Sequence, residues 1–240
     1  MGRAKNCGVL TVRCWGRIGL SCHKGAAWAV TSSAPVRPQT AEQLVLIGCD
    51  LVYRATMPFR IHLVRHGKPL CHRPAMLSAD AFRRWLTVYD AAEVDDSPPA
   101  KQAAIFKPQK GQILLCSSLR RSISSAYLLA PEGGWQSLAL FNEAAVAVPS
   151  LPLTLPAAIW TALGRVLWLT GWSSVENMRE CRIRAHSAAD MMINAAKTGE
   201  VVLVGHGWMN RMILGELRKR GLKVCATSGA GYWRHVVVGG

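Results

Sequence analysis

The sequence is short of acidic residues and of charged residues in general. Its 240 residues include 14 Asp plus Glu against 29 Lys plus Arg, a formal net charge of +15. This balance excludes an acidic disordered chain. Only 18% of the residues are charged and 50% are hydrophobic, which allows one sizeable core and disfavours a mostly disordered protein. The length predicts one globular domain with an appendage.

Long apolar runs and paired cysteines are also missing. No run reaches the roughly 18 consecutive apolar residues of a membrane-spanning helix, so we expect a soluble, cytoplasmic protein without a membrane partner. The eight cysteines form no Cys-x-x-Cys pair, which excludes a zinc ribbon and a thioredoxin-type motif. At this size a disulfide scaffold is not expected, and we expect free thiols in a reducing compartment.

Residues 1–57 differ in composition from the rest. They carry seven Lys or Arg, two acids and four of the eight cysteines, with no clear helical or strand period. An organellar transit peptide, a lipoprotein cleavage box ending at Cys49 and a true translation start at Met57 are three interpretations. An ordered pattern begins directly after Met57, which favours the third. We therefore expect residues 1–57 to be a basic extension, poorly ordered or outside the native start, and residues 58–240 to form the folded domain.

From residue 58 onward, predicted strands and helices alternate. Buried strands are expected at 60–64, 112–116, 137–141, 201–204 and 232–238. Helices are expected at 79–92, with Ser78 as N-cap, and at 156–169. Three more helices are expected: one after residues 117–118 that ends near 130, one after a Ser173/Glu176 capping box that ends near 196, and one after residues 205–207 that ends near 220. The alternation predicts an α/β sandwich with a mainly parallel sheet. Ligands bind such sheets at the carboxyl ends of the strands.

Three of these strand ends carry polar groups. They are Arg65-His66-Gly67, the stretch 117–121 (SSLRR) and Gly205-His206-Gly207. Phosphoryl transfer needs an in-line nucleophile and cations around the phosphoryl oxygens. A neutral His66 is a suitable nucleophile, and arginine guanidinium groups bind two oxygens each.

In order, these segments resemble the motifs of the histidine phosphatase superfamily, also called the phosphoglycerate mutase-like family. The strand with RHG at 61–67, SSLRRSISSA at 117–126, Glu143 after an apolar strand and VVLVGHG at 201–207 carry the resemblance, which covers residues 59–238. It implies a three-layer α/β/α sandwich and a compact, phosphatase-type member. It also places the family's phosphate-binding arginine at Arg121, the proton donor at Glu143 and the second histidine at His206.

These roles predict a phosphatase that acts through a phosphohistidine on His66. Arg65, Arg121 and a protonated His206 would bind the phosphoryl group, and Glu143 would protonate the leaving oxygen. No metal or other cofactor is required. The expected partner is a small phosphorylated substrate or a protein phosphohistidine. Taken singly, each residue also has an ordinary structural interpretation, Glu143 for instance as an N-terminal anchor of the segment that follows it.

Several positions depart from the family pattern. Lys68, Pro69 and His72 stand where the family commonly has Glu or Gln, Ser or Thr, and Asn. Lys68, His72 and Arg73 make this loop cationic, and Asn210 follows the last motif closely. We predict these four as possible substrate contacts.

Alternative functions remain open from the sequence. A phosphoglycerate-type mutase shares the site, but the short loop 144–155 predicts no tight lid, which favours hydrolysis. A phosphate-binding pseudoenzyme would retain the pocket without turnover. A basic nucleic-acid or anionic-surface binder fits the charge, although no zinc finger or aromatic RNA-binding motif supports specific nucleic-acid binding. The oligomeric state is not predicted.

Overall fold

The structure is a computed structural model that describes residues 59–95, 97–98, 111–172 and 175–240. The predictions for residues 1–57 lie outside the described residues. In the described part, none of the helices has the length and apolar character needed to cross a membrane. The four cysteines described, Cys71, Cys116, Cys181 and Cys225, are free thiols.

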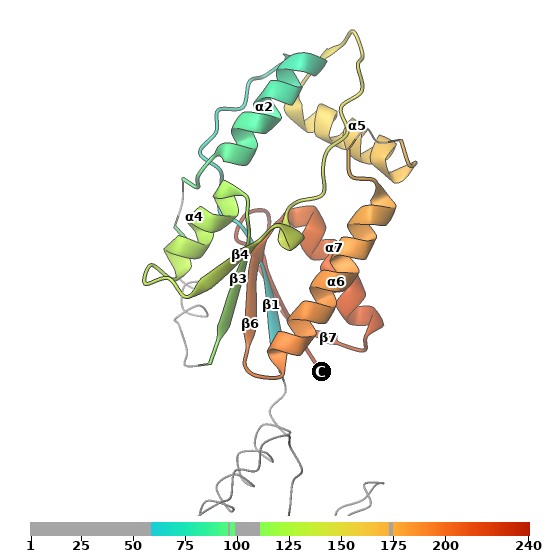
Figure 1. The fold of residues 1–240 in the computed structure, drawn as a ribbon. Coiled ribbons are helices and arrows are strands. Elements are labelled where there is room, and N and C mark those ends of the chain that lie inside the picture. Colours follow the sequence, from blue (N-terminus) through green and yellow to red (C-terminus); the bar gives the residue numbers. More distant parts are fainter. Residues whose placement is uncertain (1–58, 96, 99–110, 173–174) are drawn as a thin grey trace, which may run out of the picture. The chain divides into compact units, whose positions relative to one another are not determined.

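A six-stranded sheet forms the centre of the fold, in the order β4-β3-β6-β1-β8-β7 (Figure 1). Its strands are β1 (Arg60–Arg65), β3 (Ile113–Ser117), β4 (Trp135–Leu138), β6 (Val201–Gly205), β7 (Lys223–Ser228) and β8 (His235–Gly239). The first four in spatial order are mutually parallel, while β8 runs antiparallel to β1 and β7 antiparallel to β8. This confirms the mainly parallel sheet.

Helices cover both faces of the sheet, as Figure 1 shows. α4 (Arg120–Leu129) lies on one face, and α6 (Met178–Ala196) and α7 (Gly207–Lys219) lie on the other. Side chains alternate along β6, so Val202 and Val204 join the core under α4 while Val201 and Leu203 join the core under α6 and α7. The three-layer sandwich is therefore confirmed.

A smaller layer lies beyond the carboxyl ends of the parallel strands. It consists of α2 (Ala79–Ala91), α5 (Ala157–Leu169) and a two-stranded sheet of β2 (Leu77–Ser78) and β5 (Thr154–Leu155). The Ser78 hydroxyl accepts a hydrogen bond from the Ala81 N–H at 3.3 Å, as expected for the N-cap. Phe82 and Trp160 are fully buried between the two helices and form a separate apolar cluster.

Three predicted elements differ from the structure. The strand expected at 137–141 is β4 at Trp135–Leu138 followed by the 3-10 turn η1 (Ala139–Phe141). The helix expected to start after a Ser173/Glu176 box begins at Met178, because the next motif, Asn177 with Glu180, forms the capping box. The strand expected at 232–238 is β8, which begins at His235. β7 was not predicted, because a strand at the exposed edge of a sheet needs no alternation of apolar residues.

Candidate active site

The carboxyl ends of β1 and β3 open into a cavity of about 380 Å³ beneath α2 and α5. Four of the five residues predicted for catalysis or phosphate binding, Arg65, His66, Arg121 and Glu143, line it together. They come from the end of β1, the first turn of α4 and the loop after η1. Parallel topology brings these ends to one edge of the sheet, which is why residues distant in sequence meet there.

His66 lies at the base of this cavity and is only 2% exposed. Its Nδ1 is 2.7 Å from the Gly67 carbonyl oxygen. A carbonyl can only accept, so Nδ1 carries the proton and Nε2 keeps a lone pair. Nε2 accepts a hydrogen bond from the Arg121 Nε–H at 3.3 Å. Burial, and next the charge of Arg121, lower the pKa of His66 to about 3, so the imidazole is neutral near pH 7.

Two arginines flank His66, and each guanidinium lies over a tyrosine ring. Arg65 lies 4.6 Å from the ring centre of Tyr232, and Arg121 lies 4.7 Å from that of Tyr89. Arg121 is 2% exposed and also bonds the Asp90 carboxylate at 2.7 Å. Both cations are thereby held in place in the cavity, and Arg121 lies directly beside the Nε2 lone pair.

His206 is fully buried beside His66, with ring centres 5.1 Å apart. It lines a smaller cavity of about 100 Å³ and not the main one. Its Nε2 lies 2.6 Å from the Ser117 hydroxyl, and its Nδ1 has no hydrogen-bond partner in the described structure. Burial, then the charge of Arg121, hold the pKa of His206 well below 6.5. The expected protonated His206 is therefore disfavoured without a bound anion, although a neutral ring with a proton on Nδ1 remains a donor.

The Glu143 carboxylate reaches the start of α7. Its Oε1 accepts from the N–H groups of Met209 (2.9 Å) and Ala144 (3.0 Å), and its Oε2 accepts from that of Trp208 (3.1 Å). The carboxylate thus caps the N-terminus of α7. The structural interpretation of Glu143 had expected it to anchor the segment that directly follows it. Each carboxylate oxygen has two acceptor positions, so Oε2 keeps one free.

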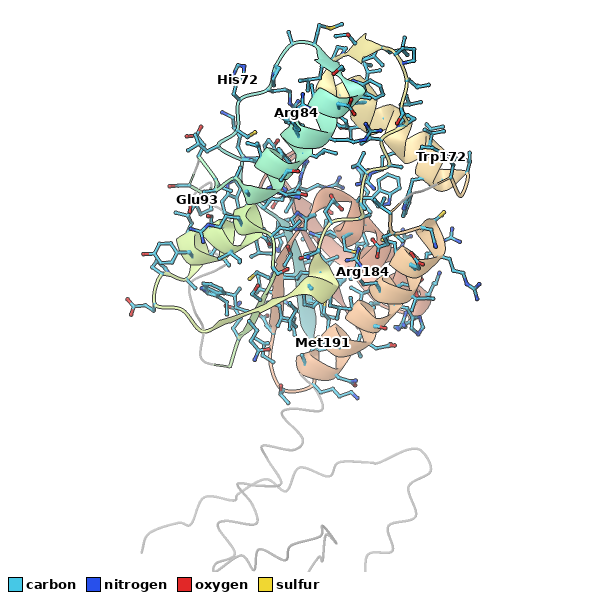
Figure 2. The ribbon with its side chains drawn as sticks, turned by 45° about the horizontal axis from the view of Figure 1, so that its top comes forward. His72, Arg84, Glu93, Trp172, Arg184 and Met191 are labelled. Carbon is cyan, nitrogen blue, oxygen red and sulfur yellow. The ribbon has the colours of Figure 1, made fainter. Side chains whose placement is uncertain are left out.

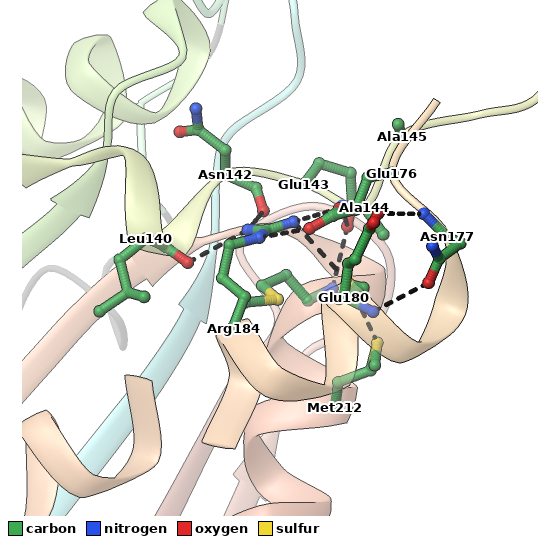
Figure 3. A network of polar contacts seen from close by, with 12 residues as sticks. Leu140, Asn142, Glu143, Ala144, Ala145, Glu176, Asn177, Glu180, Arg184 and Met212 are labelled. Carbon is green, nitrogen blue, oxygen red and sulfur yellow. Dashed lines mark hydrogen bonds and ion pairs between the residues drawn. The ribbon is translucent and has the colours of Figure 1, made fainter. Parts of the chain in front are cut away.

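Arg184 on α6 fixes the backbone before Glu143 (Figure 3). Its guanidinium donates to the carbonyls of Leu140 at 3.1 Å and Asn142 at 2.5 Å, while Glu176 binds its other side at 2.6 Å. Sequence reasoning missed this residue, because an arginine on a long helix is usually a solvated charge.

The four possible substrate contacts are dispersed. Arg73 lines the main cavity, whereas Lys68 is exposed and bonds Asp95 at 3.5 Å. His72 is exposed, and Figure 2 shows it at the outer side of the segment before α2. Asn210 bonds the Val64 carbonyl at 3.0 Å and lines the smaller cavity. The structure brings only Arg73 to the cavity that holds His66.

Tyr232 reaches the site from a strained loop before β8. Its ring centre is 5.7 Å from that of His66. The next residue, Trp233, is buried with φ of 55°, a left-handed conformation that is uncommon for an aromatic residue, and its N–H donates to the His66 carbonyl at 3.3 Å. This turn reverses the chain so that Trp233 enters the core while Tyr232 faces the cavity. The sequence predicted a strand here and missed the role of Tyr232.

Further cavity residues were also missed by sequence reasoning. The sequence around Asp90 did not indicate a role, since its partner Arg121 is distant in sequence. Arg165 is the one charged residue on the helix α5, and this isolated charge could have indicated a role. Ser117, in the motif at 117–126, does not line the cavity but contacts His206 Nε2 at 2.6 Å, a contact that the sequence did not predict. Among the residues that the structure describes, no group of three or more His, Cys, Asp or Glu side chains is arranged to hold a metal ion.

The geometry therefore provides a nitrogen nucleophile, two fixed guanidinium groups and a carboxylate around one cavity. A tetrahedral anion held by the arginines would meet the Nε2 lone pair of His66. This donor set suits a phosphoryl group, because its oxygens match the planar forks of arginine.

Several solved structures resemble this chain. Two mycobacterial structures, hydrolase 2 and hydrolase 1, share 18% and 17% identity, each over 77% of this chain and over 83% and 92% of their own, both with a TM-score of 0.50. A mycobacterial glucosyl-3-phosphoglycerate phosphatase matches with 16% identity over 68% of this chain and 81% of its own, at a TM-score of 0.46. The likeness to the two hydrolases concerns the fold alone.

By sequence, no curated protein matches the chain. The family model of the histidine phosphatase superfamily (branch 1) matches residues 100–225, just over half of the chain, which includes Arg121, Glu143 and His206 and begins after His66. The matched segment and the shared fold agree with the motifs at the strand ends. The chain belongs to the histidine phosphatase superfamily, branch 1.

Proposed function

We propose that this protein is a phosphatase that hydrolyses a phosphomonoester, or a protein phosphohistidine, through a phosphohistidine intermediate on His66. One observation carries the proposal: the Gly67 carbonyl fixes the proton of His66 on Nδ1, so Nε2 carries the lone pair, which accepts from the Arg121 Nε–H at 3.3 Å until a phosphoryl oxygen takes over that N–H. The lowered pKa of His66 supports a neutral nucleophile across the physiological range.

In the first step, Nε2 of His66 attacks phosphorus and the bond from phosphorus to the leaving oxygen breaks. Arg65 and Arg121 stabilise the charge on the phosphoryl oxygens. His206 does not line this cavity, so the hydrogen bond expected from its unpartnered Nδ1 to the phosphoryl group requires a movement of the ring when substrate binds.

Glu143 serves both steps in this proposal. Its protonated Oε2 donates to the leaving oxygen, and the resulting carboxylate takes a proton from the water that attacks the phosphohistidine. Water attack releases inorganic phosphate and returns His66 to its neutral state. The bonds from the α7 N–H groups leave one position on Oε2 for this proton.

Hydrolysis is preferred to mutase activity because the loop after Glu143 is short. A basic binding protein is a weaker alternative. The densest basic run, Arg218 to Arg220, is largely paired, since Lys219 bonds Glu216 at 2.6 Å and Arg220 bonds Asp190 at 2.8 Å. These pairs reduce the positive charge available to a polyanion.

The test is hydrolysis of an aryl phosphate in the presence of EDTA by the full chain, by His66→Ala and by His186→Ala. His186 is an exposed histidine on α6 and is the matched control. Turnover that survives chelation, persists in His186→Ala and disappears in His66→Ala would support the proposal. Acid-labile, alkali-stable phosphate bound to the protein after a rapid quench would identify the intermediate. A fully active His66→Ala protein would refute it, and phosphate binding without turnover would point to a pseudoenzyme.

A further inference from the structure

A second arginine fixes the backbone on the other side of Glu143. Arg165 on α5 donates from Nη2 to the Ala144 carbonyl at 2.7 Å and from Nη1 to the Ala145 carbonyl at 2.8 Å. These two alanines directly follow Glu143, as Figure 3 shows. Because Arg184 binds the carbonyls before Glu143, this residue lies between two stretches of backbone that are each held by an arginine.

Arg165 also contacts the part of α7 that binds the Glu143 carboxylate. Its guanidinium carbon lies 5.4 Å from the ring centre of Trp208. The Trp208 N–H donates to Glu143 Oε2 at 3.1 Å, and the Ala144 N–H donates to Oε1 at 3.0 Å. Arg165 therefore contacts two of the three residues whose N–H groups hold the carboxylate, the third being Met209.

Packing alone does not explain a charged residue at this position. Arg165 is the one charged residue on α5, it lines the active-site cavity, and both ends of its guanidinium bind neutral carbonyls. Among the residues that the structure describes, no carboxylate forms an ion pair with it. Burial lowers the pKa of Arg165, and the nearby charge of Glu143 partly opposes this shift. A half-buried cation without an ion pair costs stability, which indicates a role in the site.

We propose that Arg165 is a positioning residue, which holds the Glu143 carboxylate where it meets the leaving oxygen of the substrate. The inference rests on the proposed phosphatase function and adds to it a residue that acts through Glu143. Arg165 fixes the peptide groups after Glu143, and this role requires no bond to the substrate. Misplacement of a catalytic group by about 1 Å can cost about 100-fold in rate, so loss of these contacts should affect proton transfer strongly.

The test compares two aryl phosphates whose leaving groups differ in their need for a proton. Phenoxide is a poor leaving group that depends on a general acid, whereas 2,4-dinitrophenoxide leaves without a proton. Arg165→Met should lower kcat/KM for phenyl phosphate roughly 10- to 100-fold and change that for 2,4-dinitrophenyl phosphate by less than about threefold. Vanadate binding should change little, because Arg65 and Arg121 are unaltered.

Three further variants complete the comparison. Glu143→Gln should show the same dependence on the leaving group, and more strongly, because it removes the proton itself. Arg179→Met, at an exposed arginine on α6, is the matched control and should behave like the unaltered protein. Arg165→Lys keeps the charge but lacks the fork that binds both carbonyls, so it should lose less phenyl phosphate activity than Arg165→Met. If Arg165→Met does not fold, a loss in Arg165→Lys that is confined to phenyl phosphate decides the question.

The outcomes separate this inference from the proposed function. Equal losses for the two esters in Arg165→Met would overturn it, and weaker vanadate binding alongside them would make Arg165 a ligand of the phosphoryl group. Unchanged activity would also overturn it, while the phosphatase stands. If Glu143→Gln shows no dependence on the leaving group, Glu143 is not the proton donor and the inference fails with it, while hydrolysis through His66 stands. No turnover of either ester by the unaltered chain would count against the phosphatase itself.

Discussion

Replacing Gly164 by alanine tests whether the close contact between α5 and the loop behind the cavity controls stability. A Cβ at Gly164 would be 2.2 Å from the Ala147 carbonyl oxygen and 2.7 Å from Cγ1 of Val146. The first neighbour is backbone, so relief requires α5 or the loop to move. Gly215, at a similar depth within α7, has nothing within 4 Å of the equivalent position.

Comparing Gly164→Ala with Gly215→Ala isolates the effect of the close approach to Ala147, because both glycines lie inside 13-residue helices. Alanine in place of glycine stabilises a helix interior by about 1 kcal/mol, and both variants gain this stabilisation. Overpacking at Gly164 costs about 1–3 kcal/mol in addition. Gly215→Ala should therefore raise the free energy of unfolding by about 1 kcal/mol, and Gly164→Ala should fall about 1–3 kcal/mol below it.

Urea unfolding of the full chain at pH 7.5, followed by far-UV circular dichroism and fitted with a common m-value, measures both variants. Turnover of an aryl phosphate provides a second readout, since displacement of residues 144–146 should lower kcat/KM in Gly164→Ala and leave Gly215→Ala unchanged. Equal stabilisation of the two variants, with equal activity, would refute the reasoning about the close approach.

Three further predictions concern the site and its support. Tyr232→Leu should weaken vanadate binding roughly 3- to 30-fold, because the ring face that holds Arg65 is lost, whereas Tyr232→Phe should bind like the unaltered protein; equal loss in both would exclude the cation–ring contact. Arg184→Gln should lower kcat more than it raises KM, by freeing the backbone before Glu143, and a change in KM alone would contradict this positioning role. Burial, then the charge of Arg60, lower the pKa of His62 to about 4, so its contribution to stability is present above pH 6.5 and is lost as the pH falls towards 4, about 2 kcal/mol by pH 5. His62→Leu should flatten the unfolding free energy between pH 7.5 and 5 by that amount, and an unchanged slope would show that His62 does not titrate on unfolding.

The candidate site shows which contacts sequence reasoning could reach. The residues at the strand ends were predictable, since buried strands have a clear apolar pattern and their carboxyl ends meet at one edge of a parallel sheet. The partners of those residues were not. Asp90 pairs with Arg121 and Tyr232 holds Arg65 through contacts that no local spacing encodes.

The sequence by itself determined the α/β alternation, most element positions and the residues proposed for phosphoryl transfer, because apolar periodicity and short motifs are local properties. Tertiary structure decided the rest. It placed Lys68 and His72 outside the main cavity, put the Glu143 carboxylate at the start of α7 and fixed the proton of His66 through the Gly67 carbonyl. It also brought residues of α2, α5 and the loop 144–146 around one cavity. These features depend on distances between segments far apart in the chain, and such distances arise only when the core is packed.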